Sequence, residues 1–425
     1  MPTLCPVSLP AVCPHLVSSS PMSAGLNLAQ LQAVHYTDGP CLVLAGAGSG
    51  KTRVITHKIA HMIDAGLPAK RIAAITFTNK AAAEMRERAK GLIGRAAKDV
   101  LICTFHALGV RMMREDGKVL GLKPQFSILD ADDVTGILKD AGGSVDVATA
   151  RQWQWAISAW KNQGLNAAQA LAQAADDNER ITATVMAHYE ERLTAYQSVD
   201  FDDLISLPLK LLREHPEVRA KWQQALGHVL VDEYQDTNAT QYEVLKYLVG
   251  ERAHFTAVGD DDQSIYRFRG ARPEIMLQIP KDFPQLKQVI LKQNYRCTGE
   301  IVEKSQNVIR WNDARYEKQL FTENDKGKLI EIRTFENESE ETTWLLKQIQ
   351  KDLAEGCPHK EIAILFRTNH NCRMTVERLM EYNIPFTMRD VLPNLYEHWL
   401  AKNMVAYMRL AMGGRERKDF LAVMN

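Results

Sequence analysis

The chain has 425 residues, 45% of them hydrophobic, and 52 lysines and arginines balance 52 aspartates and glutamates. This length predicts about two to four domains with real hydrophobic cores. The balanced total is no argument for nucleic acid and does not exclude it, because a local groove can be basic in a neutral protein. No apolar stretch is long enough to span a membrane, and seven scattered cysteines without a CxxC pair argue against zinc or a disulfide framework. We therefore expect a reduced, cytoplasmic protein without a membrane partner.

Residues 1–25 differ in character from the rest of the chain. They are rich in proline and serine, lack periodicity and have no lysine or arginine before their apolar positions, which is atypical of a signal peptide. The stretch predicts a disordered tail. Met22 offers an alternative start, which would leave residues 1–21 outside the native protein.

A helix is expected next, beginning near Leu26 with Asn27 as its N-cap. Its apolar residues should face inward, and these are Leu28, Leu31 and Val34. Gln30 follows the cap, and a glutamine amide can both donate to and accept from an adenine edge. Taken alone, the same residue is an ordinary surface glutamine.

The stretch from Cys41 to Ile63 carries the strongest chemical signal. Cys41 to Leu44 is typical of a buried parallel strand, and Thr52 to Ile63 has helical spacing. A strand, a small-residue loop and a helix form the context of a phosphate-binding loop, in which backbone N–H groups and the helix dipole hold phosphate oxygens. Lys51 would reach the β- and γ-phosphates of a nucleotide, and the Thr52 hydroxyl would ligate Mg²⁺. The alternative is an ordinary tight turn. The phosphate-binding residues would be Ala45, Gly46, Ala47, Gly48, Ser49, Gly50, Lys51 and Thr52, with Ala45 where a first glycine is usual.

Two further buried strands are predicted, at residues 72–77 and 100–105, with a helix from Ala81 to Leu92 between them. Polar residues follow both strands, and ligands of parallel sheets bind at the carboxyl ends of the strands. These residues would line one edge of the sheet and contact sugar and phosphate. The alternative is that they cap the following helices, and both roles can hold for the same residue. They are Thr78, Asn79, Thr104 and His106.

The character of the chain changes from Val110 to about Tyr196, where it becomes helical and rich in alanine and glutamine. This stretch predicts a helical subdomain inserted into the sheet domain. Its tryptophans could stack on bases, but anchoring of a core is the favoured interpretation. They are Trp153, Trp155 and Trp160.

The sheet resumes with a buried strand from His228 to Val231, which ends in Asp232 and Glu233. Two adjacent acids usually mark a solvated turn. After a phosphate loop in the same chain, they are the carboxylates that nucleotide hydrolysis needs. Asp232 would hold Mg²⁺, directly or through water, and Glu233 would orient and deprotonate the attacking water.

Another strand, Phe255 to Gly259, leads into a loop with an amide, aromatic rings and arginines. Gln263 could sense the γ-phosphate or the catalytic water, Phe268 could stack on a base, and Arg269 could stabilise charge on the transferred phosphoryl group. Further on, Tyr295 would suit an adenine face and Arg296 a phosphate. The alternative for the whole stretch is a polar surface loop with an aromatic anchor.

A second unit is expected to begin near Leu291. Strands are predicted at 330–334 and 362–366, and their alternation with helices suggests a second parallel-sheet domain. The helices are expected at 339–353, with Ser339 as N-cap, at 375–382 and at 395–412.

Taken together, these motifs resemble the superfamily 1 DNA helicases of the Rep/UvrD/PcrA type, most of all the Rep branch. They cover about Leu26 to Phe386 in order. The matching stretches are Gln30, Ala45–Thr52, Thr76–Ala81, Thr104–His106, Asp200–Leu204, Val231–Asp236, Gly259–Ala271 and Asn294–Arg296.

The resemblance implies an α/β fold with a RecA-like P-loop NTPase core, a helical insertion and a partial second RecA-like domain. It also implies an ATP-driven, Mg²⁺-dependent 3′→5′ translocase and helicase. Its DNA substrates would be single strands and forks, and its protein partners those of the replisome or of repair. The implied parts are a tail at 1–25, subdomain 1A at 26–108 and 200–290, subdomain 1B at 109–199, subdomain 2A at 291–390 and the start of subdomain 2B at 391–425.

Residue roles follow from the same resemblance. Gln30, Arg53 and Tyr295 would hold the base and its surroundings, and Lys51, Thr52, Asp232 and Glu233 would act on Mg²⁺–ATP. Gln263, Arg269 and Arg296 would contact or sense the γ-phosphate. The residues expected to face DNA are Phe77, Asn79, Thr104, His106, Tyr266 and Phe268.

Three departures from the family pattern stand out. Phe268 occupies a position where the family usually has tryptophan, and residues 391–400 lack the usual Gly-Gly…Phe-Phe pattern. The chain also ends within the expected 2B insertion, before two motifs of the second core, which predicts a truncated product, a fragment or half of a split protein. One of those motifs carries an arginine that completes the ATP site. The alternative function is therefore an ATP- and DNA-binding module without unwinding activity, or an interaction fragment that competes for DNA or for a partner.

Overall fold

The computed structural model describes residues 25–143, 146–266, 270–272, 274–312, 315–368, 371–388, 399–413 and 423. Contacts divide the chain after Leu329 into two units, each of which is described by itself. The tail predicted for residues 1–25 lies outside the described residues, apart from Gly25. The division into five parts implied by the resemblance stays a prediction.

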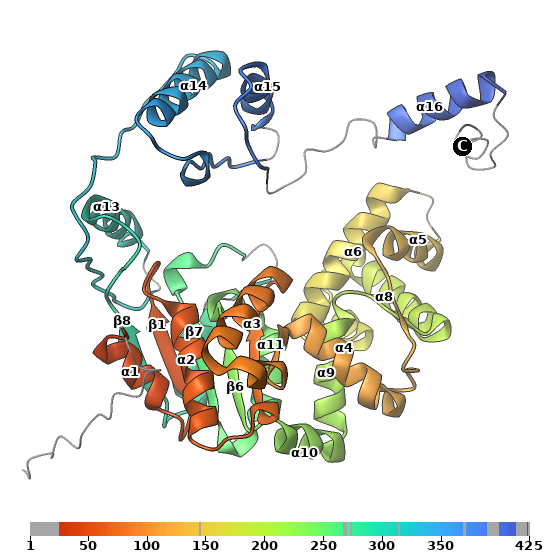
Figure 1. Cartoon of the computed structure of the whole chain (residues 1–425). Helices are drawn as coiled ribbons and strands as arrows, with labels where there is room; N and C mark the ends of the chain where they lie inside the picture. Colours follow the sequence, from red (N-terminus) through yellow and green to blue (C-terminus); the bar gives the residue numbers. More distant parts are fainter. Residues whose placement is uncertain are drawn as a thin grey trace, which may run out of the picture. The chain divides into compact units, whose positions relative to one another are not determined.

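The first unit is built on a sheet of six parallel strands in the order β3-β2-β6-β7-β1-β8 (Figure 1). The strands predicted near Cys41, Ile72, Val100, His228 and Phe255 are all confirmed. The sixth, β8, pairs with β1 at the edge of the same sheet. The strands are β1 (Cys41–Ala45), β2 (Ile72–Thr76), β3 (Leu101–Thr104), β6 (His228–Val231), β7 (Phe255–Gly259) and β8 (Lys287–Leu291).

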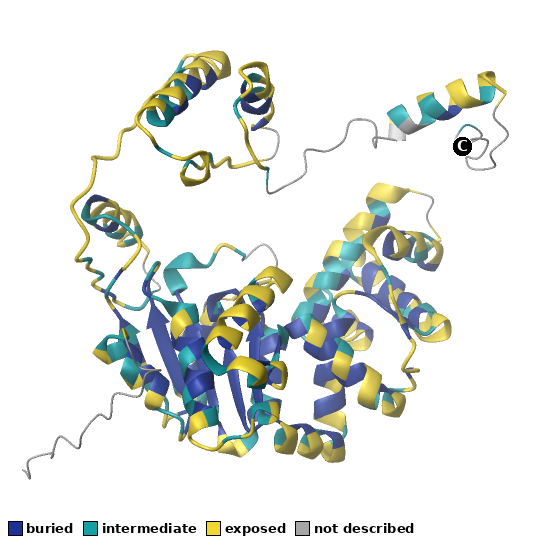
Figure 2. Cartoon of the chain, in the orientation of Figure 1, coloured by how far each residue is buried: buried dark blue, intermediate teal, exposed yellow. Residues whose placement is uncertain are grey.

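The central strands are buried on both faces (Figure 2). Side chains alternate between the faces because the strand repeat is two residues. Along β1, Leu42 and Leu44 enter one core, whereas Cys41, Val43 and Ala45 enter the other. Near-continuous apolar runs are therefore the expected pattern for such strands.

Helices cover both faces of this sheet. One face carries α1 (Leu28–His35), α2 (Lys51–Asp64) and α3 (Asn79–Ile93). The opposite face carries α4 (Phe105–Asp116), α9 (Asp203–Glu214), α10 (Pro216–Ala225), α11 (Ala239–Val249) and α12 (Glu274–Asp282). Another helix of this unit, α13 (Gly299–Ile309), follows β8 along the chain.

The first helix confirms its predicted cap and corrects its predicted face. Asn27 forms a capping box with Gln30, in which each side chain accepts a hydrogen bond from the backbone N–H of the other residue. Leu28 is 86% exposed, however, and Ala33 and Val34 are the buried apolar residues. The prediction for Leu28 was wrong because a residue in the first turn can lie beyond the edge of the surface that the helix covers.

The predicted helical insertion consists of α5 (Ala131–Gly142), α6 (Val147–Asn162), α7 (Ala167–Gln173) and α8 (Asp177–Tyr196), with a core of their own. Two short parallel strands, β4 (Ser127–Ile128) and β5 (Ser198–Val199), pair at its base. Trp153 and Trp160 pack against the helical core as expected. Trp155 is 70% exposed, so core anchoring is wrong for this tryptophan.

The second unit contains α14 (Glu338–Ala354), α15 (Arg373–Glu381) and α16 (Trp399–Ala411). The three predicted helices are confirmed, although the N-cap of α14 is Asn337 and not Ser339. Residues 395–398 of the last predicted helix lie outside the described residues.

The two strands predicted for this unit, at 330–334 and 362–366, are wrong for the described residues, because neither forms a ladder. Ile332 and Leu365 are 91% and 92% exposed. A strand requires a second backbone to accept and donate its hydrogen bonds, and apolar β-propensity cannot supply one. The second parallel sheet expected from the αβ alternation is therefore absent from the described residues.

Candidate active site

The carboxyl ends of the parallel strands lie along one edge of the sheet. The phosphate loop follows β1, Asp232 follows β6 and Asp260 follows β7, and these three strands are neighbours in the order β6-β7-β1. Phe77 and Thr104 follow or end β2 and β3, on the far side of β6. Ligands of open α/β sheets bind at this edge. The predicted site residues thus fall into two adjoining groups. The first, called the nucleotide group, surrounds the phosphate loop and includes Lys51, Asp232 and Glu233. The second, called the aromatic group, lies beyond it and includes Phe77 and His106.

The loop between β1 and α2 has the backbone geometry of an anion cradle. Gly48 and Gly50 have φ values of +67° and +88°, which favour glycine over every other residue. The Ser49 hydroxyl donates to the Gly46 carbonyl at 2.7 Å and closes the turn. Gly50 is the N-cap of α2, and no side chain of the described residues caps this helix. The first N–H groups of α2 therefore remain available to an anion.

Lys51 lies at the centre of the first group. Its ammonium is 3.2 Å from Glu233 Oε2 and donates to Gln263 Oε1 at 3.3 Å. The side chain is only 10% exposed. The three residues come from the ends of three different strands or their following turns, and only the sheet order brings them together. A lysine held between a carboxylate and an amide is placed to meet a phosphate group between the two.

Two carboxyl groups near Glu233 are poorly compensated. Burial, together with Glu233, raises the pKa of Asp232 and that of Asp236 to about 7 each. Asp236 Oδ1 is buried and has no hydrogen-bond partner among the described residues. A cation beside these groups would relieve their repulsion. Thr52 and Asp232 therefore offer the kind of oxygen ligand that Mg²⁺ takes.

Gln235 was missed in the sequence, although it lies inside the motif that Asp232 opens. Its amide donates to Glu233 Oε2 at 2.9 Å, and its carbonyl oxygen accepts from the Asp260 N–H at 2.9 Å. It therefore ties the acid after β6 to the end of β7. A glutamine three residues after a strand-ending aspartate was the available signal.

A second segment packs on the phosphate loop. The Asn294 amide donates to the Ala47 carbonyl at 2.7 Å, and the Tyr295 N–H donates to the Gly48 carbonyl at 3.0 Å. The Tyr295 hydroxyl accepts from the Asn27 amide at 2.7 Å, and the ring is 45% exposed. This arrangement leaves an aromatic face beside the loop, as a base-binding residue requires.

The remaining predicted nucleotide contacts surround the same loop. Gln30 is buried and donates to the Ser49 carbonyl at 2.9 Å, which leaves one N–H and one lone pair of its amide for a base edge. Arg53 and Arg296 are exposed. Arg269 and Phe268 lie outside the described residues.

The second group is aromatic. The Phe77 and Tyr266 rings lie 5.2 Å apart, and the His106 ring stacks on Phe201 at 4.1 Å. Burial lowers the pKa of His106 to about 4, so its imidazole is neutral at pH 7. Asn79 is exposed.

Thr104 serves as a helix cap. Its hydroxyl accepts from the Ala107 N–H at 3.1 Å, and the residue is 6% exposed. Thr78 caps α3 in the same way, by accepting from the Ala81 N–H. The capping interpretation therefore describes both threonines, as the sequence allowed.

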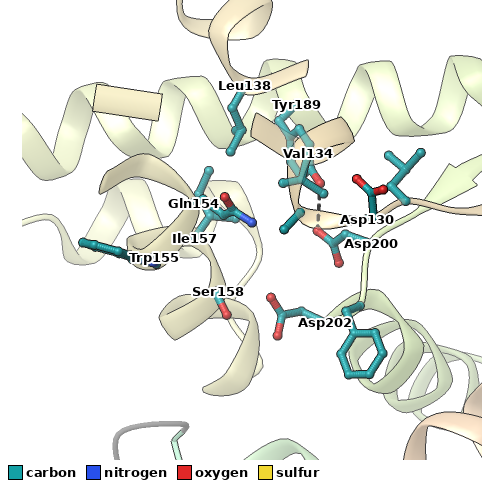
Figure 3. Close-up of a pocket in the computed structure, with 13 residues that line it drawn as sticks. Asp130, Val134, Leu138, Gln154, Trp155, Ile157, Ser158, Tyr189, Asp200 and Asp202 are labelled. Atoms are coloured by element: carbon teal, nitrogen blue, oxygen red, sulfur yellow. Dashed lines mark hydrogen bonds between the residues drawn. The ribbon is translucent and has the colours of Figure 1, made fainter. Parts of the chain in front are cut away.

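Phe201 was not among the predicted site residues, although it lies within the Asp200–Leu204 match. Lys161 Nζ lies 2.6 Å from both Asp200 Oδ2 and Asp203 Oδ1. The Tyr189 hydroxyl donates to Asp200 at 2.9 Å (Figure 3). Although burial alone would lower the pKa of Lys161, the two aspartates hold it above its ordinary value. These buried bonds fix the turn, and Phe201 on the same turn is 60% exposed.

A cavity of about 170 Å³ adjoins this turn. Asp202 and Trp155 line it, from the turn and from α6 respectively (Figure 3). Asp202 is hydrogen-bonded to the Asn162 amide at 3.0 Å, so its carboxylate is already engaged at the wall of the cavity.

The comparisons with known proteins agree with this arrangement. Residues 26–284 match the family model of the UvrD/REP helicase N-terminal domain, and residues 289–425 match that of the UvrD-like helicase C-terminal domain. The chain is 42% identical over 406 residues to the ATP-dependent DNA helicase Rep of Escherichia coli (strain K12). The aligned stretch covers 94% of this chain and 60% of that protein. It is 36% identical over 405 residues to the ATP-dependent DNA helicase PcrA of Staphylococcus aureus (strain Mu50), covering 94% and 55% respectively. The chain thus spans less than two thirds of the length of these relatives. Among the described residues, no helix combines the length and apolar character that crossing a bilayer requires.

Proposed function

Because the chain belongs to the UvrD/Rep helicase family, we propose that it is an ATP-dependent motor that translocates 3′→5′ on single-stranded DNA and unwinds duplexes. The observation that carries the proposal is the position of Lys51 between Glu233 and Gln263, at the mouth of the phosphate loop. DNA forks in the cytoplasm would be the substrate, with replisome or repair proteins as partners.

Each residue of the first group has a role in this proposal. Residues 45–52 hold the phosphates through backbone N–H groups, and Lys51 pairs with the β- and γ-phosphates. Glu233 accepts a proton from the attacking water, and Gln263 orients that water or senses the γ-phosphate. Mg²⁺, held by Thr52 and Asp232, supplies charge neutralisation when bound. Arg296 and Arg269 would stabilise phosphoryl charge, while Gln30, Arg53 and Tyr295 would surround the base.

The aromatic group supports the DNA part of the proposal. Phe77, Tyr266, His106 and Phe201 are aromatic side chains along the edge that continues from the nucleotide group, and stacking on bases tolerates any sequence. A neutral His106 imidazole can stack without adding charge. Phe268 and Asn79 would extend this surface.

The test is steady-state ATP hydrolysis by the full chain, with and without single-stranded DNA, beside a Lys51→Ala variant. We expect DNA to raise the rate and Lys51→Ala to lower it by about 100-fold or more, because the lysine stabilises developing phosphate charge. Lys90→Ala, on the exposed side of α3, is the matched control and should keep the rate.

The outcome decides between the motor and the ATP- and DNA-binding module. DNA-stimulated hydrolysis, followed by separation of a duplex with a 3′ single-stranded tail, supports the motor. Binding of ATP and DNA without stimulated turnover would contradict it and favour a binding module.

A further inference from the structure

Residues 315–321, here called the strap, connect the turn after β7 with the phosphate loop. The Tyr316 N–H donates to Asp261 Oδ2 at 2.6 Å, and the Tyr316 hydroxyl donates to the Met276 carbonyl at 2.9 Å. At the other end, a Cβ built on Gly46 would lie only 2.6 Å from Leu320 Cδ1, so Leu320 packs directly on the loop. The strap therefore contacts both sides of the nucleotide group.

Lys318, in the middle of the strap, is completely buried. Its ammonium lies 2.6 Å from Asp260 Oδ1 and 3.2 Å from Asp262 Oδ2, and it also pairs with Asp261. Arg315 adds a two-point contact to Asp262, at 2.9 and 2.8 Å. The three carboxylates have ligand oxygens within 4.8 Å of one another, a spacing that could suit a metal ion. Two protein cations already pair with this cluster, so we interpret it as an ion-pair network and not as a metal site.

The cluster continues into the proposed active site. The second oxygen of the Asp260 carboxylate, Oδ2, accepts a hydrogen bond from Gln263 Nε2 at 2.6 Å. Gln263 then presents its carbonyl oxygen to Lys51 Nζ at 3.3 Å. The Asp260 bond fixes which way the Gln263 amide points, because its two ends are a donor and an acceptor.

We propose that Lys318 is a positioning residue for the hydrolysis proposed above: it fixes Asp260, which in turn holds the Gln263 amide against Lys51. The proposal rests on the proposed function. In this proposal Lys318 does not contact the nucleotide and acts only through Asp260 and Gln263. Without its ammonium, three close carboxylates would repel one another, and Asp260 would turn away from Gln263.

The test compares Lys318→Met, Gln263→Ala and the double variant in steady-state ATP hydrolysis. We expect Lys318→Met to lower kcat about tenfold with KM changed less than about twofold, because Gln263 acts on the reacting group whereas the loop binds the phosphates. In the Gln263→Ala background, Lys318→Met should lower kcat by less than about twofold further. A purely structural lysine would lower kcat by the same factor in both backgrounds, and that result would overturn the proposal.

Lys161→Met is the matched control, because it removes an equally buried lysine from two aspartates outside the nucleotide group. It should lower the melting temperature but leave DNA-independent kcat within about twofold of wild type. If Lys318→Met does not fold, Asp260→Asn replaces it: a carboxamide has only one acceptor oxygen, so it cannot accept from Lys318 and Gln263 together, and the orientation of the Gln263 amide is no longer fixed. An unchanged kcat in that variant would overturn the proposal.

The wild-type chain and Lys51→Ala separate this inference from the function on which it rests. An inactive wild type overturns both. An active wild type that needs Lys51, together with an unimpaired Lys318→Met variant, overturns only the role of Lys318.

Discussion

Glu233 has a left-handed backbone, with φ +49° and ψ +45°, directly after β6. For a residue with a side chain this conformation costs of the order of 1 kcal/mol or more. The Asp232 carboxylate accepts from the Glu233 N–H at 3.0 Å, and the Gln235 amide holds the Glu233 carboxylate. The surrounding bonds thus maintain a strained turn that directs the acid toward Lys51.

The buried His106 makes the folding stability depend on pH. Burial lowers its pKa from 6.5 to about 4, so the unfolded chain takes up the proton more readily than the folded chain. Its contribution to stability is therefore fully present above pH 6.5 and is lost as the pH falls toward 4. As the pH falls through this range, we expect the free energy of unfolding of wild type to decrease by up to about 2 to 3 kcal/mol more than that of His106→Gln.

The measurement is chemical denaturation of both proteins between pH 4 and pH 7. His228, which is also buried with a lowered pKa, is common to both and cancels in the difference. If the two stabilities fall in parallel, folding does not lower the pKa of His106.

At the scale of elements, α4 and α9 cross at unusually short range. A Cβ built on Gly109 would lie 1.7 Å from the Leu204 carbonyl oxygen. Pro208, inside α9, has no N–H, so it cannot donate to the carbonyl of Leu204 four residues earlier. The glycine lets the two helices come into contact where α9 is irregular. This contact lies just after the turn that contains Phe201.

We expect Gly109→Ala to lower the free energy of unfolding by about 2 to 4 kcal/mol, because the added methyl group cannot avoid the Leu204 backbone. Gly136→Ala in α5 is the matched control: its Cβ would meet open space. That substitution should be neutral or stabilising by up to about 1 kcal/mol, because alanine favours the helix. Denaturant titration measures both, and equal effects would contradict the close crossing.

At the scale of the molecule, residues 329–337 join the two units without regular structure, and nearly all of them are exposed. Proteases cleave such segments because few contacts must break. Residues 1–50 contain no lysine or arginine, so trypsin cannot cut there.

We expect limited trypsin digestion to cut after Lys328 or Arg333 before any site in residues 51–312. Mass spectrometry of the fragments identifies the first cut. In a Lys328→Gln, Arg333→Gln variant the early fragment should disappear. An initial cut within α5 to α8 would show that the helical insertion opens more readily than this connection.

The sequence by itself determined the local features of this protein. The phosphate loop, the strand-ending acids and the cap at Asn27 were readable because each depends on residues within a few positions of one another. The motifs in their order also indicated the family. Apolar runs predicted five of the six strands of the sheet, because its central strands are buried on both faces; the edge strand β8, which is partly exposed, was not predicted.

The tertiary structure alone decided what depends on distant partners. The apolar runs at 330–334 and 362–366 resemble strands, yet no described backbone pairs with them. The order β6-β7-β1 sets Lys51 against Glu233 and Gln263, and the return of the strap puts Lys318 among three aspartates. Such contacts join residues tens to hundreds of positions apart, so no local pattern records them, and only the folded chain brings their charges within reach.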